Sequence, residues 1–113
     1  MANLRLNIAR EYSRCPGARY DREGDYSGER FREHFLLPRL KEAIATGGML
    51  EVVLDGSAGY STAFIEESFG GLIRVDGLSL QEIKDHLIII SEEDVTYINE
   101  IDFYLQNAWE HHS

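Results

Sequence analysis

Residues 51–72, EVVLDGSAGYSTAFIEESFGGL, carry the main information about the fold. The run at residues 52–54 is apolar and mostly β-branched, which is typical of a strand in a sheet covered on both faces. A loop with two glycines follows at residues 55–59, and apolar residues then recur at helical spacing from Phe64 to Phe69. A strand, a short loop and a helix in this order predict an α/β unit.

The same pattern extends outward along the chain. Residues 4–8 alternate apolar and polar side chains, as a half-buried strand does, and residues 87–90 (LIII) form a second continuous apolar run. We therefore expect a small mixed β-sheet with helices packed against it, and we expect Val53 and Ile89 in its core.

Three further helices are predicted from capping residues and periodicity. Ser27 is the expected N-cap of a helix that ends at Gly47-Gly48, with Arg32 on its wet side and a kink or break at Pro38. A capping box at residues 79–82 opens a short helix. A second cap beginning at Ser91 opens the last helix, which runs to about residue 109 with Ile98 facing inward. Residues 10–26 are polar and predict a hairpin or an extended loop.

The bulk properties indicate one domain, residues 1–113, with a core at about residues 4–105. The net charge of −9 argues against nucleic acid and anionic membranes as partners. Neither a membrane-spanning run nor a signal-peptide core is found, and the single cysteine, Cys15, indicates a reducing, cytoplasmic setting. The oligomeric state is left open.

The most informative candidate site lies where the strand at residues 52–54 leads into the next helix. Free N–H groups at a helix start can hold an anion or a phosphorylated side chain, and Ser61 and Thr62 lie there. The simpler alternative is that one of them only caps the helix. The pattern argues against a serine hydrolase, because a nucleophile elbow ends in glycine at a strand end, whereas here Ala63 takes that place and six residues separate Leu54 from Ser61.

A second candidate surface is the arginine-rich loop with Arg10, Arg14, Arg19 and Arg22. Arginine can grip a carboxylate or phosphate with two hydrogen bonds. The alternative is that interleaved acidic residues neutralise these arginines on the surface. The sequence has no metal-ligand spacing, no phosphate loop and no clustered acid–base pair, so we expect no metal, no cofactor and no enzyme activity.

Three segments resemble the bacterial STAS-like domains of unknown function: residues 16–20 (PGARY), residues 26–33 (YSGERFRE) and residues 59–72 (GYSTAFIEESFGGL). The resemblance covers roughly residues 4–105. STAS domains are similar to anti-sigma factor antagonists, in which a partner kinase of the histidine-kinase-like ATPase type phosphorylates a serine at a helix start. By position the resemblance implies Ser61 as acceptor and Thr62 as second choice. The antagonists have Asp-Ser-Ser-Gly where this chain has Tyr60, Ser61, Thr62 and Ala63.

The resemblance implies a regulatory domain that binds a protein partner and is switched by phosphorylation. Its expected binding or switch residues are Asp55, Tyr60, Ser61, Thr62 and Arg19. The alternative is a small-ligand or nucleotide-sensing domain that uses the same helix start and Arg19. A sensor should show a closed pocket beside Ser61, whereas a binding module should show a flat, partly apolar surface.

Overall fold

The computed structural model describes residues 3–112, which form a three-stranded sheet and a set of helices. The strands β1 (Asn3–Asn7), β2 (Met49–Val53) and β3 (Leu87–Ile90) are all parallel and lie in the order β1-β2-β3. The α/β class predicted from the sequence is confirmed. The described sheet is parallel rather than mixed, because each strand returns to the sheet through a helical crossover.

The first crossover contains the short helix α1 (Ile8–Glu11), an irregular segment and one long helical run. The irregular segment is an extended loop with a single 3-10 turn at Asp21–Glu23, and no hairpin forms in it. The helical run comprises α2 (Gly28–Phe31), a π-helical turn at Arg32–Leu36 and α3 (Leu37–Thr46).

The second crossover repeats this arrangement. It comprises α4 (Thr62–Ile65), a π-helical turn at Glu66–Gly70, α5 (Gly71–Arg74) and the separate helix α6 (Leu80–His86). The last helix, α7 (Thr96–His111), follows β3. The N-caps predicted at Ser27 and Ser79 are present, since each hydroxyl accepts a backbone N–H of the first turn.

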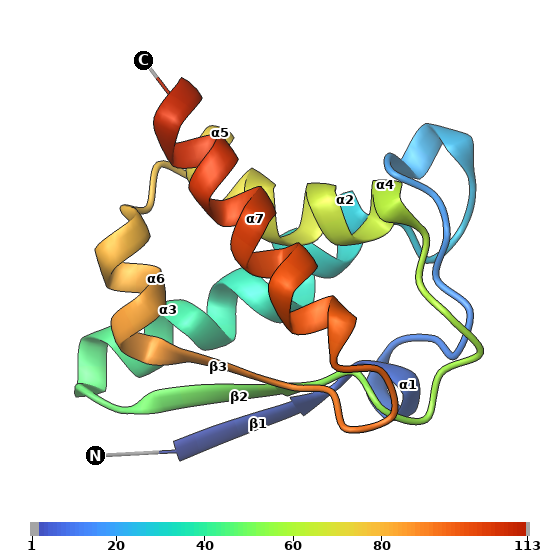
Figure 1. The fold of residues 1–113 in the computed structure, drawn as a ribbon, viewed down its shortest axis with the longest axis horizontal. Helices are drawn as coiled ribbons and strands as arrows, with labels where there is room; N and C mark the ends of the chain where they lie inside the picture. The colour runs from blue at the N-terminus through green and yellow to red at the C-terminus, as the bar shows by residue number, and fades with distance from the viewer. Residues whose placement is uncertain (1–2, 113) are drawn as a thin grey trace.

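The long helices lie on one face of the sheet, which makes a two-layer structure (Figure 1). The helix-facing side carries Leu6, Leu50 and Val52, all fully buried. On the opposite face Arg5 and Ile88 are exposed. The expectation of a sheet covered on both faces is therefore wrong. Val53 is nevertheless buried as predicted, between its neighbours in β1 and β3, and Ile89 is partly buried and packs against the helix-side core.

A kink or break is predicted at Pro38; the helical run departs from α-helical geometry just before this residue but does not end there. A proline inside an α-helix lacks an N–H and crowds the carbonyl four residues earlier. Here the π-helical turn at Arg32–Leu36 directly precedes it, and Pro38 lies in the first positions of α3. In a π-helical turn the backbone N–H groups bond carbonyls five residues earlier instead of four. This change of spacing falls where Pro38 has no N–H to donate, so the helical run continues.

Two expectations about the last helix are wrong. The Ser91 hydroxyl donates to the Asp94 carbonyl at 2.6 Å, and α7 begins only at Thr96 with the Asp94 carboxylate accepting its N–H at 3.0 Å. Ile98 is 39 % exposed, because Ile101 and Leu105 are the side chains that α7 buries.

Candidate functional site

Ser61 is the N-cap of α4, as its place in the sequence predicted. Its hydroxyl oxygen accepts the Phe64 N–H at 3.0 Å, and the same hydroxyl donates to the Gly17 carbonyl at 2.7 Å. Gly59, with a positive φ of 142°, lets the chain turn into this position. Ser61 is half-buried, whereas Thr62 beside it is exposed. One hydroxyl thus joins the helix start to a distant segment.

Tyr60 supports this loop from inside. Its hydroxyl donates to the Leu54 carbonyl at 2.7 Å, and its ring stacks on Phe64 with centroids 5.9 Å apart. The backbone N–H of Tyr60 donates to the hydroxyl oxygen of Tyr97 at 3.2 Å. Burial raises the pKa of Tyr60 to about 12. The structure therefore places Tyr60 as packing beneath the loop rather than as a free surface group.

Asp55 ties the loop after β2 to the loop after β3. Its two carboxylate oxygens accept the N–H groups of Glu92 and Glu93 at 3.1 and 2.8 Å. In return the Glu93 side chain accepts the Gly56 N–H at 2.8 Å. These reciprocal bonds hold the carboxyl ends of β2 and β3 in one arrangement.

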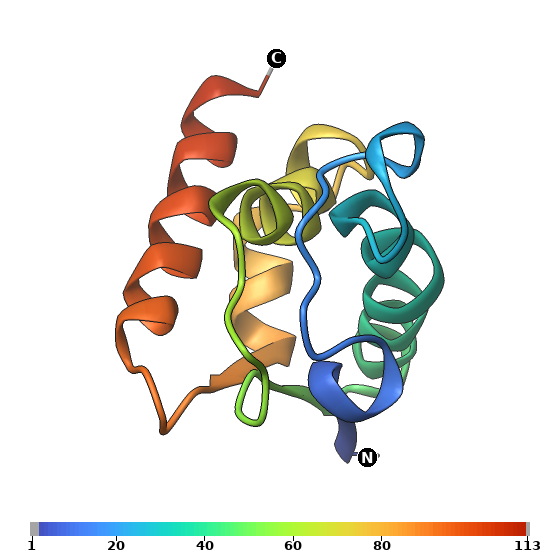
Figure 2. The same cartoon turned by 90° about the vertical axis from the view of Figure 1, so that its right-hand side faces the viewer.

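The segment at residues 14–20 runs beside the loop that leads into α4 (Figure 2). The Ala58 N–H donates to the Arg14 carbonyl at 2.8 Å on one side. On the other side, the N–H groups of Gly28 and Glu29 donate to the carbonyls of Ala18 and Arg19 at 2.9 and 3.0 Å. The segment is therefore held between the starts of α4 and α2.

Arg19 anchors this segment to the π-helical turn that follows α4, rather than to the start of α4. Its guanidinium donates to the Glu66 carboxylate and lies 3.8 Å from that of Glu67. Arg19 is expected to share one binding face with residues 60–62, but in the structure it is Gly17 that contacts this stretch, through Ser61. Of the other loop arginines, Arg14 donates to the Gly56 carbonyl at 3.3 Å and Arg22 stacks over Tyr20.

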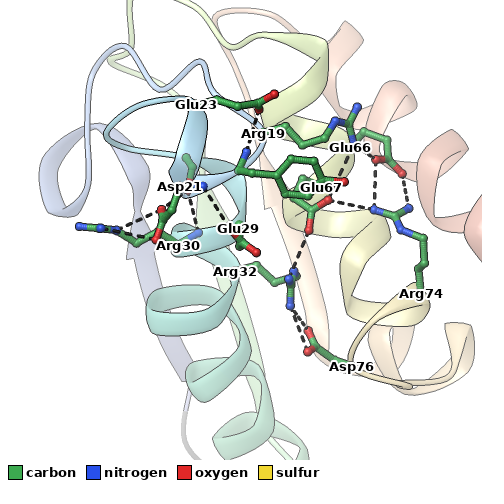
Figure 3. A network of polar contacts seen from close by, with 12 residues as sticks. Arg19, Asp21, Glu23, Glu29, Arg30, Arg32, Glu66, Glu67, Arg74 and Asp76 are labelled. Carbon is green, nitrogen blue, oxygen red and sulfur yellow. Dashed lines mark hydrogen bonds and ion pairs between the residues drawn. The ribbon is translucent and has the colours of Figure 1, made fainter.

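Arg19 belongs to a larger ion-pair network that the sequence reading missed (Figure 3). It joins the two helical runs and comprises Arg19, Arg32, Arg74, Glu66, Glu67 and Asp76. Three positive charges face three negative ones, so the network is neutral. The side chains of Arg32 and Glu67 are each 3 % exposed, which places this pair inside the protein.

Arg32 is the centre of this ion-pair network, and the expectation that it lies on a wet surface is wrong. Its Nη1 contacts both oxygens of Asp76 at 3.0 and 2.8 Å, and its Nη2 donates to Glu67 at 3.2 Å. The π-helical turn that begins at Arg32 changes the helical phase on which the expectation rested. Gly71 leaves the space that the guanidinium fills, since a Cβ there would lie 2.5 Å from Arg32 Nε.

Two signals in the sequence pointed to this network without revealing it. The pair Glu66-Glu67 interrupts an otherwise apolar helix, and Gly70-Gly71 has no side chains and so permits close approach of another segment. Their partner Arg32 could not be assigned, because pairing across two helices depends on their packing.

The Glu66 carboxyl lies at the partly exposed end of the network. Burial by itself would raise its pKa, but the hydrogen bonds and charges of Arg74 and Arg19 outweigh burial and hold the pKa below its usual value of 4.5. A carboxyl with a lower pKa in the folded state stabilises the protein above the pKa of the unfolded state.

We therefore expect the free energy of unfolding to fall as the pH drops below about 4.5 and through the lower folded-state pKa of Glu66. Urea titrations between neutral and acid pH would measure this slope. The Glu66→Gln variant should show a shallower slope, whereas Glu33→Gln, at an exposed position, should match the wild type. Equal slopes for the wild type and Glu66→Gln would contradict this prediction.

None of the helices in residues 3–112 is long and apolar enough to cross a membrane, and these residues contain no group of His, Cys, Asp or Glu placed to hold a metal ion.

Comparison with known proteins identifies one family. No curated protein and no solved structure gives a significant match. The family model of the STAS-like domain of unknown function (DUF4325) matches residues 27–96, which include β2, β3 and the second crossover between them. This chain belongs to that STAS-like family.

Proposed function

We propose that this chain is a regulatory domain that acts by binding a protein partner in the cytoplasm, rather than by catalysis. Its binding face comprises the loop at residues 55–62, the start of α4 and the adjacent residues 14–26. A partner of the histidine-kinase-like ATPase type phosphorylates Ser61 and thereby changes this face. Membership of the STAS-like family supports the regulatory role.

The observation that carries the proposal is the double hydrogen bond of the Ser61 hydroxyl. The oxygen caps α4, and the hydrogen holds the Gly17 carbonyl. The cap needs only an acceptor, which a phosphorylated serine retains. The bond to Gly17 needs the hydroxyl hydrogen, which phosphorylation removes. One modification therefore spares the helix and breaks the link to the neighbouring segment.

Electrostatics acts in the same direction. A phosphate adds about −1.5 to −2 charges at neutral pH and would lie beside the carbonyl oxygen that Ser61 now binds. Arg19, the nearest arginine along that segment, is already paired with Glu66 and Glu67. Phosphorylation should thus push the segment at residues 14–20 away from α4 and expose the surface beneath it.

The same geometry gives less support to a small-ligand sensor. The hollow beside the loop, of about 180 Å³, is lined by residues of the two loops after β2 and β3 together with Tyr97. Ser61 does not line this hollow. Arg19, the cation that the sensor alternative required, is committed to Glu66.

The direct test is phosphorylation of the purified chain by ATP and an extract of its native cells, followed by mass spectrometry. We expect the phosphate on Ser61 in the wild type and in Thr62→Ala, and no phosphate at this helix start in Ser61→Ala. Phosphate found only on Thr62, or none on either residue, would contradict the proposal.

A stability and proteolysis comparison tests the switch itself. Ser61→Ala should lower the free energy of unfolding by about 1 kcal/mol through loss of the cap. Ser61→Asp retains a capping carboxylate but loses the hydroxyl hydrogen, so trypsin should cleave after Arg14 and Arg19 faster than in the wild type. Thr62→Asp carries the same charge next to Ser61 and should leave cleavage unchanged. Equal cleavage of the two aspartate variants would refute the switch.

A further inference from the structure

The free edge of β3 carries a second surface that is separate from Ser61. β2 lies at the centre of the described sheet, so β1 and β3 each have one edge without a strand partner. β1 carries the exposed charge of Arg5, whereas β3 consists of leucine and three isoleucines without proline or charge. Exposed edges are usually protected by charges or proline, because a free strand edge pairs readily with another chain.

An apolar groove of about 300 Å³ lies beside this strand. Six of its eight lining residues are apolar and come from α6, β3 and α7, and the other two are Lys84 and Asp102: Ile83, Lys84, Leu87, Ile89, Ile98, Ile101, Asp102 and Leu105. α7 packs mainly against α5 and the turn at Glu66–Gly70, so it leaves the side of β3 open. This explains the 39 % exposure of Ile98, which helical periodicity had predicted to be buried.

The charge around the groove identifies the kind of partner. The elements that form the groove, at residues 80–90 and 96–106, contain four acidic residues and one lysine, a net charge of −3. Lys84 lies 3.3 Å from Asp102, and both side chains remain about half exposed, so the surface around this pair stays negative overall. A second copy would bring two such acidic surfaces together and be repelled, whereas a basic segment would be attracted.

We propose that the β3 edge and this groove bind an extended, basic segment of a partner protein by adding it to the sheet as a further strand. Backbone hydrogen bonds to β3 supply affinity in this mode, and alternate side chains supply specificity. The apolar side chains of the segment fill the groove beside Ile98, and its flanking lysines or arginines face Asp85 and Asp102. None of the groove residues belongs to the proposed Ser61 face, so either proposal can fail while the other stands.

The probe is a blocked, fluorescently labelled peptide with the sequence Lys-Val-Thr-Val-Thr-Val-Lys, titrated with the full chain in low salt. We expect binding that weakens as salt rises, and roughly tenfold weaker binding of the same peptide with glutamate in place of lysine. A peptide N-methylated on alternate residues, in either phase, cannot complete the strand ladder and should also bind roughly tenfold more weakly in at least one phase.

Matched variants locate the binding surface. Ile98→Ala should weaken binding about fivefold, whereas Ile88→Ala, at a side chain of similar exposure on the other face of the sheet, should leave it unchanged. The double variant Asp85→Asn, Asp102→Asn should weaken binding and its salt dependence. The control pair Glu33→Gln, Glu42→Gln removes the same charge elsewhere and should have little effect.

Several results would overturn the proposal. Absence of binding at millimolar protein, equal affinity for the lysine and glutamate peptides, or full affinity of both N-methylated peptides would each do so. Sedimentation velocity gives the remaining case: a dimer of the free chain that Ile98→Ala weakens would show that a second copy occupies this edge instead.

Discussion

Replacing Arg32 with alanine is expected to lower the free energy of unfolding by about 3–5 kcal/mol. The substitution removes a guanidinium that is 3 % exposed and bonds both Glu67 and Asp76. Two carboxylates then stay in or near the interior with their charge balance lost. Glu67 keeps one bond to Arg74 at 3.1 Å, but Asp76 loses the only ion pair shown for it among the described residues. Chemical denaturation at neutral pH would measure the loss.

Arg39 provides a matched control on the same helical run. Its guanidinium pairs with Glu11 at 3.0 Å, but both side chains are about one-third exposed. Water screens such a pair, so Arg39→Ala should cost less than about 1 kcal/mol. A loss of similar small size for Arg32→Ala would mean that the buried ion-pair network does not hold the two helices together.

The second large effect is expected for Gly28→Ala, which should lower the free energy of unfolding by about 1–3 kcal/mol. Gly28 starts α2 at the point where this helix meets α4. A Cβ there would lie 2.8 Å from the Phe64 carbonyl oxygen and 3.1 Å from the Glu67 Cβ. The nearest atom belongs to helix backbone and cannot rotate away, so the two helices must move apart. That movement would also stretch the Arg32–Glu67 pair.

Gly17→Ala is the control for this effect. A Cβ at Gly17 would meet nothing within 4 Å, and its φ is not positive. We expect a change within about ±0.5 kcal/mol in thermal or chemical unfolding. If Gly28→Ala unfolds as the wild type does, the close approach of α2 and α4 is not a constraint on this fold.

Arg32 and Gly28 belong to one contact region between the two helical runs. Gly28 and Gly71 lie where a side chain would collide with the other helical run, and the buried Arg32 guanidinium occupies the space beside Gly71. The paired π-helical turns at Arg32–Leu36 and Glu66–Gly70 belong to the same contact region. Because Glu66 and Glu67 also hold Arg19, this region connects the helix packing to the segment that Ser61 fixes. A partner that moves the segment at residues 14–20 would therefore act on the edge of the ion-pair network.

The sequence by itself determined the local elements and the helix start at Ser61. Its strand and helix periods, the caps at Ser27, Ser61 and Ser79, and the end of α3 at Gly47 all depend on near neighbours in the chain, so they could be predicted. Family resemblance then indicated the STAS-like class.

Only the tertiary structure decided the ion-pair network, the uncovered sheet face and the exposure of Ile98. Arg32 and Asp76 are 44 residues apart, and the Arg32 guanidinium lies in space that a side chain at Gly71 would fill. Helical periodicity assumes a constant 3.6 residues per turn, so it assigned Arg32 to solvent. For Ile98 the period was correct, but which stripe of α7 is buried depends on where α7 lies over the sheet. Such contacts between distant segments arise from packing, so local signals such as Glu66-Glu67 and Gly70-Gly71 do not identify the partner.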